Sequence, residues 1–384
     1  MSPNVQAASS VGRIALAGAT GRIGSALAAG LVSDPVSVVA LTRDPQTARL
    51  PDTTAVVTVD FDQPGSLESA LQGAKRLFIV HGTSPRQVRN EIALIDAAVK
   101  VGVAHVVKVS SMGPPSTLPP FAWHIAIEAH LAKQPIGYTV LRPSAFVDIL
   151  RRAGSQVSAG NWGGAAGEGL VNFIDTRDVA DVARAALLAA LEPGTQRVHH
   201  LTGSRSWSMP QIAEELSRLL GRQILYEHRT PAAQRELLLR SGLNAFGADL
   251  LLGLDTVFRA SALAETTSTV EELTGHAPRS VPAWLAENRD VFSTSEPVRA
   301  CRSHRRTVSL QPHSVAGRPC HACRTHLPMG VVKAPWCNAG LSPACVRPTA
   351  HQYVSKKGGF RDKSLALPEL CPAFRLNTLP FTCR

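Results

Sequence analysis

The sequence predicts a doubly wound α/β fold, a parallel sheet covered by helices on both faces, and three observations support it. From residue 12 to about 142, short apolar runs alternate with longer stretches whose apolar residues recur at i, i+3 and i+4. The runs are nearly continuous Val, Ile, Leu and Ala, which is typical of strands buried on both faces. A glycine-rich turn follows the first run and opens the first helical stretch. This order of elements is that of a doubly wound α/β domain.

The individual elements follow from the two periodicities. The β-rich apolar runs predict strands over residues 13–18, 36–42, 55–61, 76–82, 105–111 and 138–143. The intervening stretches predict helices over residues 21–33, 65–73, 86–102 and 121–134. A helix thus follows four of the six strands, and this alternation predicts parallel neighbours joined by helical crossovers.

After Arg142 the alternation loosens into a smaller, mainly helical region. A Gly-rich loop over 158–170 precedes a short strand over 171–174 and a helix over 175–193, which Asp175 or Asp178 would cap. A strand over 198–203 and a helix over 208–221 follow, and the remaining helices are predicted over 231–241, 244–260 and 269–274. Such a region would lie beside the ligand cleft of the first domain and shape a substrate pocket.

Charge, proline and cysteine change together near residue 297. Residues 297–384 hold 14 Lys and Arg, 2 Asp and Glu, ten of the 27 prolines and all seven cysteines, which leaves a net charge of −1 for the rest of the chain. The body therefore has no basic footprint for nucleic acid and no disulfide framework. We expect a flexible N-terminus (1–11), a dinucleotide-binding domain (12–150), a substrate-binding region (151–296) and a largely disordered tail (297–384).

Two negative predictions concern metal and membrane. Cys320-x-x-Cys323 lacks the second Cys or His pair of a strong zinc motif, so we predict no metal site. The N-terminus lacks the basic start and apolar run of a signal peptide, and no stretch is long enough for a membrane span. We expect a cytoplasmic protein without a membrane partner.

The glycine turn has the spacing Gly18-x-x-Gly21-x-x-Gly24. The first glycine would permit the tight turn, the second would let the backbone approach a pyrophosphate, and the third would let helix and strand pack closely. The phosphate would then lie at the helix N-terminus. A strand-to-helix turn that uses glycine for geometry alone is the alternative.

The end of the second strand bears on the choice of cofactor. An NAD site places Asp or Glu about 20 residues after the glycines to hold the ribose hydroxyl, whereas this sequence has Thr42 and Arg43 there. Arg43, together with Arg22 of the glycine turn, could clamp a 2′-phosphate, which favours NADPH. Asp44 keeps the opposite preference open, since a shift by one residue would bring an acid to the ribose. Arg43 could also be a solvated surface charge.

The end of the third strand carries Asp60 and Phe61. The carboxylate could accept from the adenine amino group, and the aromatic edge could wall the ring. For Asp60, a plain turn residue at the strand end is the alternative.

The segments "ALAGATGRIGSALAAGL", "HVVKVSSMG", "WHIAIEAHLAKQPIGYTVLRPSAFVDIL" and "FIDTRDVADVARAAL" resemble successive signatures of the NmrA-like, atypical short-chain dehydrogenase/reductase family. The resemblance covers roughly residues 12–293. It implies an NADP(H)-binding Rossmann domain in which Arg43 holds the 2′-phosphate and the phosphates lie on Gly18, Thr20, Gly21, Arg22 and Gly24. It also implies that the adenine contacts Asp60 and Phe61 and that the ribose contacts His81, Gly82 and Thr83. The nicotinamide would contact Pro143, Ser144 and Phe146.

The catalytic motif of the parent dehydrogenases is a Tyr-x-x-x-Lys pair on one helix face, and this sequence differs from it. No Lys occurs from Phe121 to Leu131, so lysine-assisted ketone reduction is not expected. The helix offers His124-x-x-x-Glu128 instead, in which Glu128 would orient or charge the imidazole and His124 would donate a proton. Packing of His124 and a surface pair for Glu128 are the alternative. Ser110 and Ser111 could meet a substrate oxygen or could simply cap the strand end.

Aromatic side chains could give a flat, apolar substrate a place to stack. The candidates are Trp123, Phe146, Trp162 and Phe173, each of which could equally belong to the core.

The prediction is an NADPH-dependent oxidoreductase that transfers hydride to a quinone-like or aromatic polyketide-type small molecule, with secondary metabolism as a candidate setting and a homodimer as the candidate assembly. Members of the resembling family include quinone and azo reductases and also cofactor-sensing regulators. A non-catalytic NADP(H) sensor that acts through a protein partner is therefore the alternative.

Overall fold

The six predicted strands of the first domain form one parallel sheet with a strand from the second region. The computed structural model describes residues 12–114 and 118–293. The sheet contains β1 (Arg13–Ala17), β2 (Ser37–Thr42), β3 (Thr54–Thr58), β4 (Ala74–Ile79), β5 (His105–Val109), β6 (Gly137–Pro143) and β10 (Gln196–Leu201). Its order is β10-β6-β5-β4-β1-β2-β3, and all neighbouring strands are parallel.

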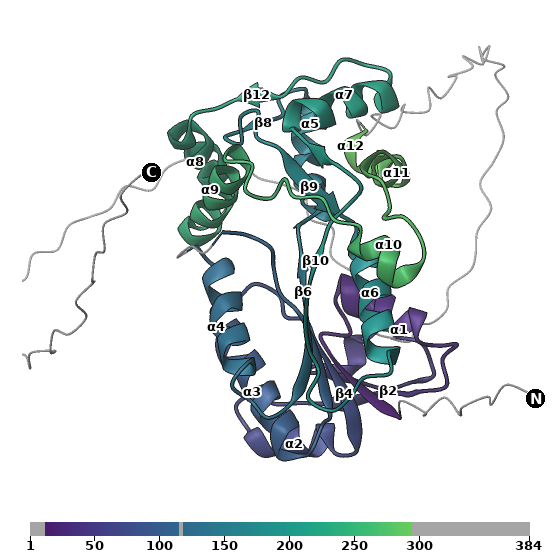
Figure 1. The fold of residues 1–384 in the computed structure, drawn as a ribbon. Coiled ribbons are helices and arrows are strands. Elements are labelled where there is room, and N and C mark those ends of the chain that lie inside the picture. Colours follow the sequence, from purple (N-terminus) through teal and green to yellow (C-terminus); the bar gives the residue numbers. More distant parts are fainter. Residues whose placement is uncertain (1–11, 115–117, 294–384) are drawn as a thin grey trace, which may run out of the picture. The chain divides into compact units, whose positions relative to one another are not determined.

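Helices cover both faces of this sheet (Figure 1). One face carries α1 (Arg22–Gly30), α6 (Thr176–Leu188) and α10 (Thr269–Thr274), and the other carries α2 (Pro64–Leu71), α3 (Gln87–Lys100) and α4 (Phe121–Leu131). Leu16 of β1 packs in the first of these two cores, and its neighbour Ala15 packs in the second. Both faces of the strands are therefore apolar, which explains the continuous apolar runs and confirms the predicted fold class.

The chain changes direction between β1 and β4. It runs outward from β1 through β2 to β3, and then returns to the other side of β1 to build β4, β5 and β6. The loops that follow β1 and β4 therefore diverge and leave a crevice at the carboxyl ends of the strands. Ligands of open α/β sheets bind at such a switch point.

The second region also contributes to the first, because β10 extends the sheet and α6 packs beside α1. Helix α6 begins after Asp175, whose carboxylate accepts a hydrogen bond of 2.8 Å from the backbone N–H of Arg177. Asp178, the other predicted cap, is buried and accepts the backbone N–H of Arg279 at 2.8 Å. Of the two alternatives, the structure selects Asp175.

The other elements belong mostly to the smaller region, apart from a short 3₁₀ turn, η1 (Pro45–Thr47). Three predicted helices appear as α7 (Met209–Leu220), α8 (Pro231–Arg240) and α9 (Ala245–Arg259). The neighbouring helical elements are η2 (Val147–Ala153), α5 (Gly154–Ala159), α11 (Val281–Glu287) and α12 (Arg289–Phe292). The sequence did not indicate these four elements because they lack a sustained period. The short strands are β7 (Ala145–Phe146), β8 (Gly163–Gly164), β9 (Val171–Ile174), β11 (Ser206–Trp207) and β12 (Glu227–His228).

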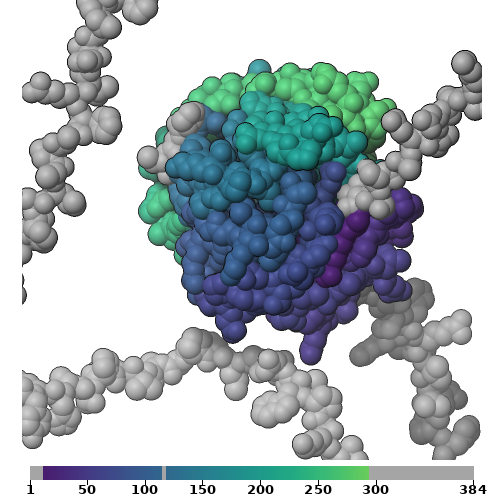
Figure 2. All heavy atoms as spheres, turned by 60° about the horizontal axis from the view of Figure 1, so that its bottom comes forward, coloured from purple at the N-terminus to yellow at the C-terminus, as the bar shows by residue number. Residues whose placement is uncertain are grey.

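The two regions meet directly: in Figure 2 the purple and blue N-terminal residues pack against the teal and green ones. Among the described residues, no helix is long and apolar enough to cross a membrane. The predictions for the N-terminus (1–11) and for the tail, including Cys320 and Cys323, concern residues outside the described ranges.

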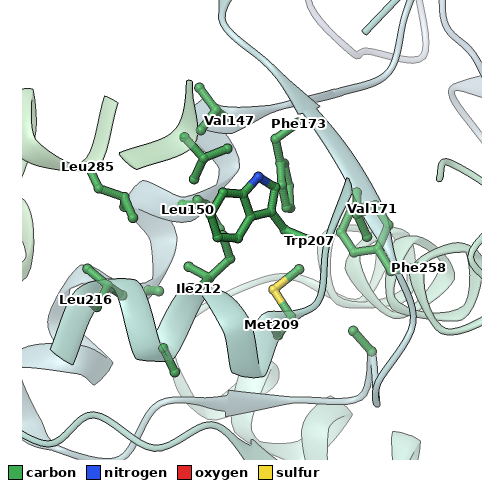
Figure 3. Packing of buried hydrophobic residues seen from close by; sticks show 14 of the residues in the cluster. Val147, Leu150, Val171, Phe173, Trp207, Met209, Ile212, Leu216, Phe258 and Leu285 are labelled. Atoms are coloured by element: carbon green, nitrogen blue, oxygen red, sulfur yellow. The ribbon is translucent and has the colours of Figure 1, made fainter. Parts of the chain in front are cut away.

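The smaller region has its own apolar core, centred on Trp207 (Figure 3). Ile212 and Leu216, four residues apart on α7, present one helix face to it. Phe173 is 1% exposed and belongs to this core, so it is not a pocket residue. This packing fixes η2, which contributes Asp148 to the edge of the crevice.

Candidate active site

The turn between β1 and α1 has the geometry of a phosphate cradle. Gly18 has φ +88°, and a Cβ there would lie 2.1 Å from the carbonyl oxygen of Val80. A Cβ on Gly24 would lie 2.2 Å from the carbonyl oxygen of Gly18, so the third glycine permits close packing of the helix on the turn. Gly21 is the N-cap of α1, and within the described residues no side chain caps the helix. Its first N–H groups are therefore available to an anion.

A cleft of about 710 Å³ opens above this turn at the switch point of the sheet. Ten of the predicted ligand residues line it: Gly18, Thr20, Gly21, Arg22, Arg43, Phe61, His81, Gly82, Thr83 and Phe146. A Cβ on Gly82 would meet nothing within 4 Å, so this glycine leaves the cleft wall open. The glycine turn, the uncapped helix and the open wall fit the pyrophosphate and ribose of a nicotinamide dinucleotide.

The end of β2 brings both Arg43 and Asp44 to the cleft wall. Arg43 is exposed, and no ion pair engages it among the described residues. The carboxylate of Asp44 accepts the backbone N–H of Gln46 at 3.1 Å and thereby caps η1. Arg22 contacts a carboxylate across the cleft, with 3.3 Å between its Nε and Oδ1 of Asp148. Of the two predicted arginines, Arg43 is thus the one without a carboxylate partner.

Asp60 and Phe61 separate at the end of β3. Phe61 lines the cleft. The two carboxylate oxygens of Asp60 accept the backbone N–H of Asp62 and Nε2 of Gln63, both at 2.9 Å. Asp60 therefore has the turn geometry that was the alternative to adenine recognition.

Pro143 and Ser144 are buried behind the cleft wall. The carbonyl oxygen of Pro143 accepts the backbone N–H of Met112 at 2.8 Å. The backbone N–H of Ser144 donates to the carbonyl oxygen of Leu201 at 2.9 Å, and its hydroxyl donates to Oδ1 of Asn172 at 3.4 Å. Both residues thus connect neighbouring strands, and neither lines the cleft.

A buried polar network lies on the β5 side of the cleft. Lys108 of β5 is 0% exposed, and its Nζ donates to Oε2 of Glu91 at 2.7 Å. The same Nζ lies 3.2 Å from Nδ1 of His124. Nε2 of Gln87 donates to Oε1 of Glu91 at 2.9 Å and lies 3.4 Å from Nε2 of His124. The imidazole of His124 is thus held between α3 and β5.

This environment keeps His124 neutral. Burial, the positive charge of Lys108 and the neighbouring His81 lower the pKa of His124 to about 2. Near neutral pH the ring is therefore an imidazole with one N–H donor and one acceptor nitrogen.

The predicted pairing of Glu128 with His124 is wrong. Glu128 accepts a hydrogen bond from Ser110 and pairs with Arg142 of β6, whose Nε lies 3.2 Å from Oε1. The i, i+4 spacing places the two side chains on one helix face, but Arg142 offers a stronger, charged partner. The partners of His124 come instead from other elements.

The lysine that the helix lacks is supplied by the neighbouring strand. The absence of Lys from Phe121 to Leu131 was a correct observation, but it does not exclude a lysine beside His124. Lys108 in the apolar run "HVVKVSS" is the signal that could have revealed it, because a charge in a strand covered on both faces needs a buried partner. Gln87 and Glu91 gave a second signal, since they occupy the i and i+4 positions of the buried face of α3.

The remaining predicted residues are scattered. The hydroxyl of Ser111 is buried and has no hydrogen-bond partner among residues 12–114 and 118–293. Trp123 stacks on Phe246 of α9 with 6.4 Å between ring centroids. Trp162 is 6% exposed, lies in edge contact with Tyr226, and lines a separate cavity of about 120 Å³ in the smaller region. Of the predicted pocket aromatics, Phe146 alone lines the main cleft.

A doubly wound parallel sheet with a glycine turn, an uncapped helix N-terminus and a cleft at its switch point defines the class of dinucleotide-binding proteins. Residues 18–190 match the NAD(P)H-binding family. The chain belongs to the NmrA-like group of atypical short-chain dehydrogenases/reductases and is an NAD(P)H-dependent oxidoreductase. The predicted family resemblance is thereby confirmed.

Three known proteins illustrate this relationship. The NAD(P)H azoreductase of Xenophilus azovorans is 30% identical over 288 residues, which cover 73% of this chain and 100% of that protein. Quinone oxidoreductase 2 of Escherichia coli (strain K12) is 31% identical over 273 residues, covering 68% and 94%, respectively. The crystal structure of the Escherichia coli NADPH-dependent quinone oxidoreductase QOR2 complexed with NADPH is 26% identical, with a TM-score of 0.65 over 72% of this chain and 99% of that chain.

Proposed function

We propose that the protein uses NADPH to reduce a quinone-like or other electron-poor aromatic small molecule. The observation that carries the choice of cofactor is the end of β2, where the exposed Arg43 lines the cleft and the carboxylate of Asp44, which lines it too, is engaged in capping η1. A guanidinium at this position suits a 2′-phosphate, whereas a carboxylate would repel it. When bound, NADPH would supply a hydride to the substrate.

The protein's own residues have separate tasks in this proposal. The N-terminus of α1 and the glycine turn hold the pyrophosphate, and Phe61 contacts the adenine. Phe146 lines the cleft on the β6 side and provides an apolar surface for a flat ring. The neutral imidazole of His124 offers an N–H donor rather than a positive charge.

The substrate class is supported by the relatives. The names of two of them, an azoreductase and a quinone oxidoreductase, specify electron-poor aromatic acceptors. Such acceptors depend mainly on alignment with the nicotinamide, because their own potential drives the reduction. The alternative of a non-catalytic sensor has no support from these relatives.

An activity panel tests the proposal. The purified protein is mixed with NADPH or NADH and a series of quinones and azo dyes, and the loss of cofactor absorbance is followed. We expect oxidation that requires an acceptor and is faster with NADPH. Tight binding of NADPH without oxidation by any acceptor would refute the enzymatic function and restore the sensor.

A further inference from the structure

The three hydrogens of the Lys108 ammonium all have acceptors. Nζ lies 2.7 Å from Oε2 of Glu91, 3.1 Å from the carbonyl oxygen of Val109 and 3.2 Å from Nδ1 of His124. An ammonium group has three donors and no acceptor. Nδ1 of His124 therefore accepts a hydrogen bond, and the single hydrogen of the neutral ring resides on Nε2.

This Nε2–H has no acceptor within the described residues. Nε2 of Gln87 lies 3.4 Å away, but it carries hydrogens itself and donates to Glu91 at 2.9 Å. Turning the amide would bring its oxygen against the carboxylate of Glu91. In the orientation found, Oε1 of Gln87 is buried and has no partner in the part of the chain that the structure describes. An unpaired donor and an unpaired acceptor thus lie near each other, and the donor is the group that a substrate carbonyl oxygen would require.

The pair lies behind the part of the cleft wall that α3 forms. Strand β5 is two strands from β1 on one side, whereas Arg43 follows β2 on the other side. Asn90, one residue before Glu91 on α3, lines the cleft and lies 3.1 Å from Nε2 of His81, which lines it too. The network of Lys108 and His124 therefore adjoins the cleft end that is remote from the 2′-phosphate site.

We propose that Lys108 and His124 form a proton relay that protonates the substrate oxygen as the ring is reduced; this inference rests on the proposed function. The O–H bond forms as the Nε2–H bond of His124 breaks, and Nδ1 takes a proton from Nζ of Lys108. The quinone gains a hydrogen with its electron pair from the reduced nicotinamide, which is oxidised, and the proton from His124 completes the hydroquinone. Lys108 regains its proton from solvent through His124 after the product leaves. His124 is the catalytic residue, and Lys108 is the positioning residue that acts through it.

A relay is required because a neutral imidazole alone is a very weak acid. The ring can release the hydrogen on Nε2 only as Nδ1 gains another. The charged or titratable groups around the ring are Lys108 from β5, Glu91 from α3, His81 after β4, Glu128 on α4 and Arg142 from β6. The last two pair with each other, which leaves Lys108 as the proton source in hydrogen-bond contact.

Two electron acceptors, one that needs a proton when it is reduced and one that does not, distinguish the relay from a purely structural role of Lys108 and His124. Reduction of a quinone requires a proton, whereas a triarylmethyl cation such as crystal violet takes up hydride alone. With K108M, H124F or H124Q we expect quinone reduction to fall by about 100-fold or more, and dye reduction to change by less than about threefold. H124Q keeps an N–H donor but cannot pass a proton on.

K100M is the matched control. Nζ of Lys100 on α3 lies 2.6 Å from Oε1 of Glu68 on α2, so it also forms a lysine–carboxylate pair, but the lysine side chain is 67% exposed. Both rates should be unchanged in K100M. Equal losses with both acceptors in K108M, or undiminished quinone reduction, would overturn the relay. Failure of the wild-type protein to oxidise NADPH with any acceptor would instead refute the proposed function.

A solvent isotope effect tests the proton relay with the quinone alone, without the dye. In single-turnover quinone reduction, we expect the wild-type protein to be measurably slower in D₂O, because protons move with the electron pair. An equal rate in H₂O and D₂O would overturn the relay.

The tautomer of His124 can be measured without cofactor or substrate. ¹⁵N spectra of the imidazole should show hydrogen on Nε2 in the wild-type protein and a mixture of tautomers with a higher pKa in K108M. Hydrogen on Nδ1 in the wild-type protein would overturn the assignment. Should K108M fail to fold because Glu91 is left unpaired, the double variant E91Q/K108M removes both charges and permits the same measurements.

Discussion

The guanidinium of Arg22 and the carboxylate of Asp148 form an ion pair across the cofactor cleft, with 3.3 Å between Nε and Oδ1. The arginine is mostly exposed and the aspartate is mostly buried, and both line the cleft. We therefore expect Asp148 to compete with a bound phosphate for Arg22. The ion pair positions the guanidinium but reduces the positive potential that a dinucleotide meets.

D148N tests this competition. The amide can still bind the hydroxyl of Thr176, which lies 3.3 Å from Oδ2, but it no longer opposes the phosphates. We expect NADPH to bind roughly fivefold more tightly, or about 1 kcal/mol, with a gain that shrinks at high salt. Titration of NADPH at two ionic strengths measures both effects. Unchanged or weaker binding would show that Asp148 does not compete for Arg22.

R43A tests the cofactor preference. Loss of charge-assisted hydrogen bonds to the 2′-phosphate should weaken NADPH by about 1.5–3 kcal/mol, roughly 10- to 100-fold, with little effect on NADH. Arg49 is exposed on the same segment but does not line the cleft, so R49A is the matched control. Equal losses for both cofactors in R43A would contradict the assignment.

The third glycine of the turn is predicted to be indispensable for packing. The Cβ of G24A would lie 2.2 Å from the carbonyl oxygen of Gly18 and 2.7 Å from Cα of Ala19, and backbone atoms cannot yield easily. We expect a loss of about 2 kcal/mol or more in the free energy of unfolding, together with weaker NADPH binding. Urea unfolding and NADPH titration measure the two losses.

Gly65 provides the comparison for Gly24. It lies in the first turn of α2, and its Cβ would meet nothing within 4 Å. G65A should therefore stabilise the protein by up to about 1 kcal/mol through helix propensity. Similar urea midpoints for the two variants would indicate that Gly24 is not tightly packed.

The lowered pKa of His124 predicts a loss of stability in mild acid. Its pKa is about 2 in the folded protein, against 6.5 for the unfolded chain, so the unfolded state binds the additional proton between these values. Stability is fully present above pH 6.5 and falls as the pH falls, by about 2 kcal/mol between pH 7.5 and pH 5. H124F should show a pH dependence weaker by this amount in urea unfolding. Parallel curves of unfolding free energy against pH for the wild-type protein and H124F would disprove the lowered pKa of His124.

Glu128 should matter for stability and not for the tautomer of His124. E128Q removes the carboxylate that pairs with Arg142, whose side chain is 36% exposed, and should lower the free energy of unfolding by about 1 kcal/mol. The ¹⁵N spectrum of His124 should remain that of the wild-type protein. A change of tautomer in E128Q would restore the pairing that helix spacing suggested.

Local sequence features were sufficient for much of the fold and the cofactor cradle. The spacing of Gly18, Gly21 and Gly24 reports a positive φ and close backbone approaches, which are properties of a few consecutive residues. Sequence patterns could not choose between Asp175 and Asp178 as helix caps, because the choice depends on Arg279, about 100 residues away, which engages Asp178. The short elements around η2 were missed because they are too short to show a period.

The sequence by itself determined the parallel sheet, the glycine turn and the arginine at the end of the second strand, since each depends on periodicity or on neighbouring residues. The tertiary structure decided which groups surround His124. Lys108, Glu91 and His124 come from three elements, and only the packing of α3 and α4 over β5 brings them together. A buried ammonium must find acceptors wherever the fold supplies them, and the spacing along one helix contains no information about a neighbouring strand.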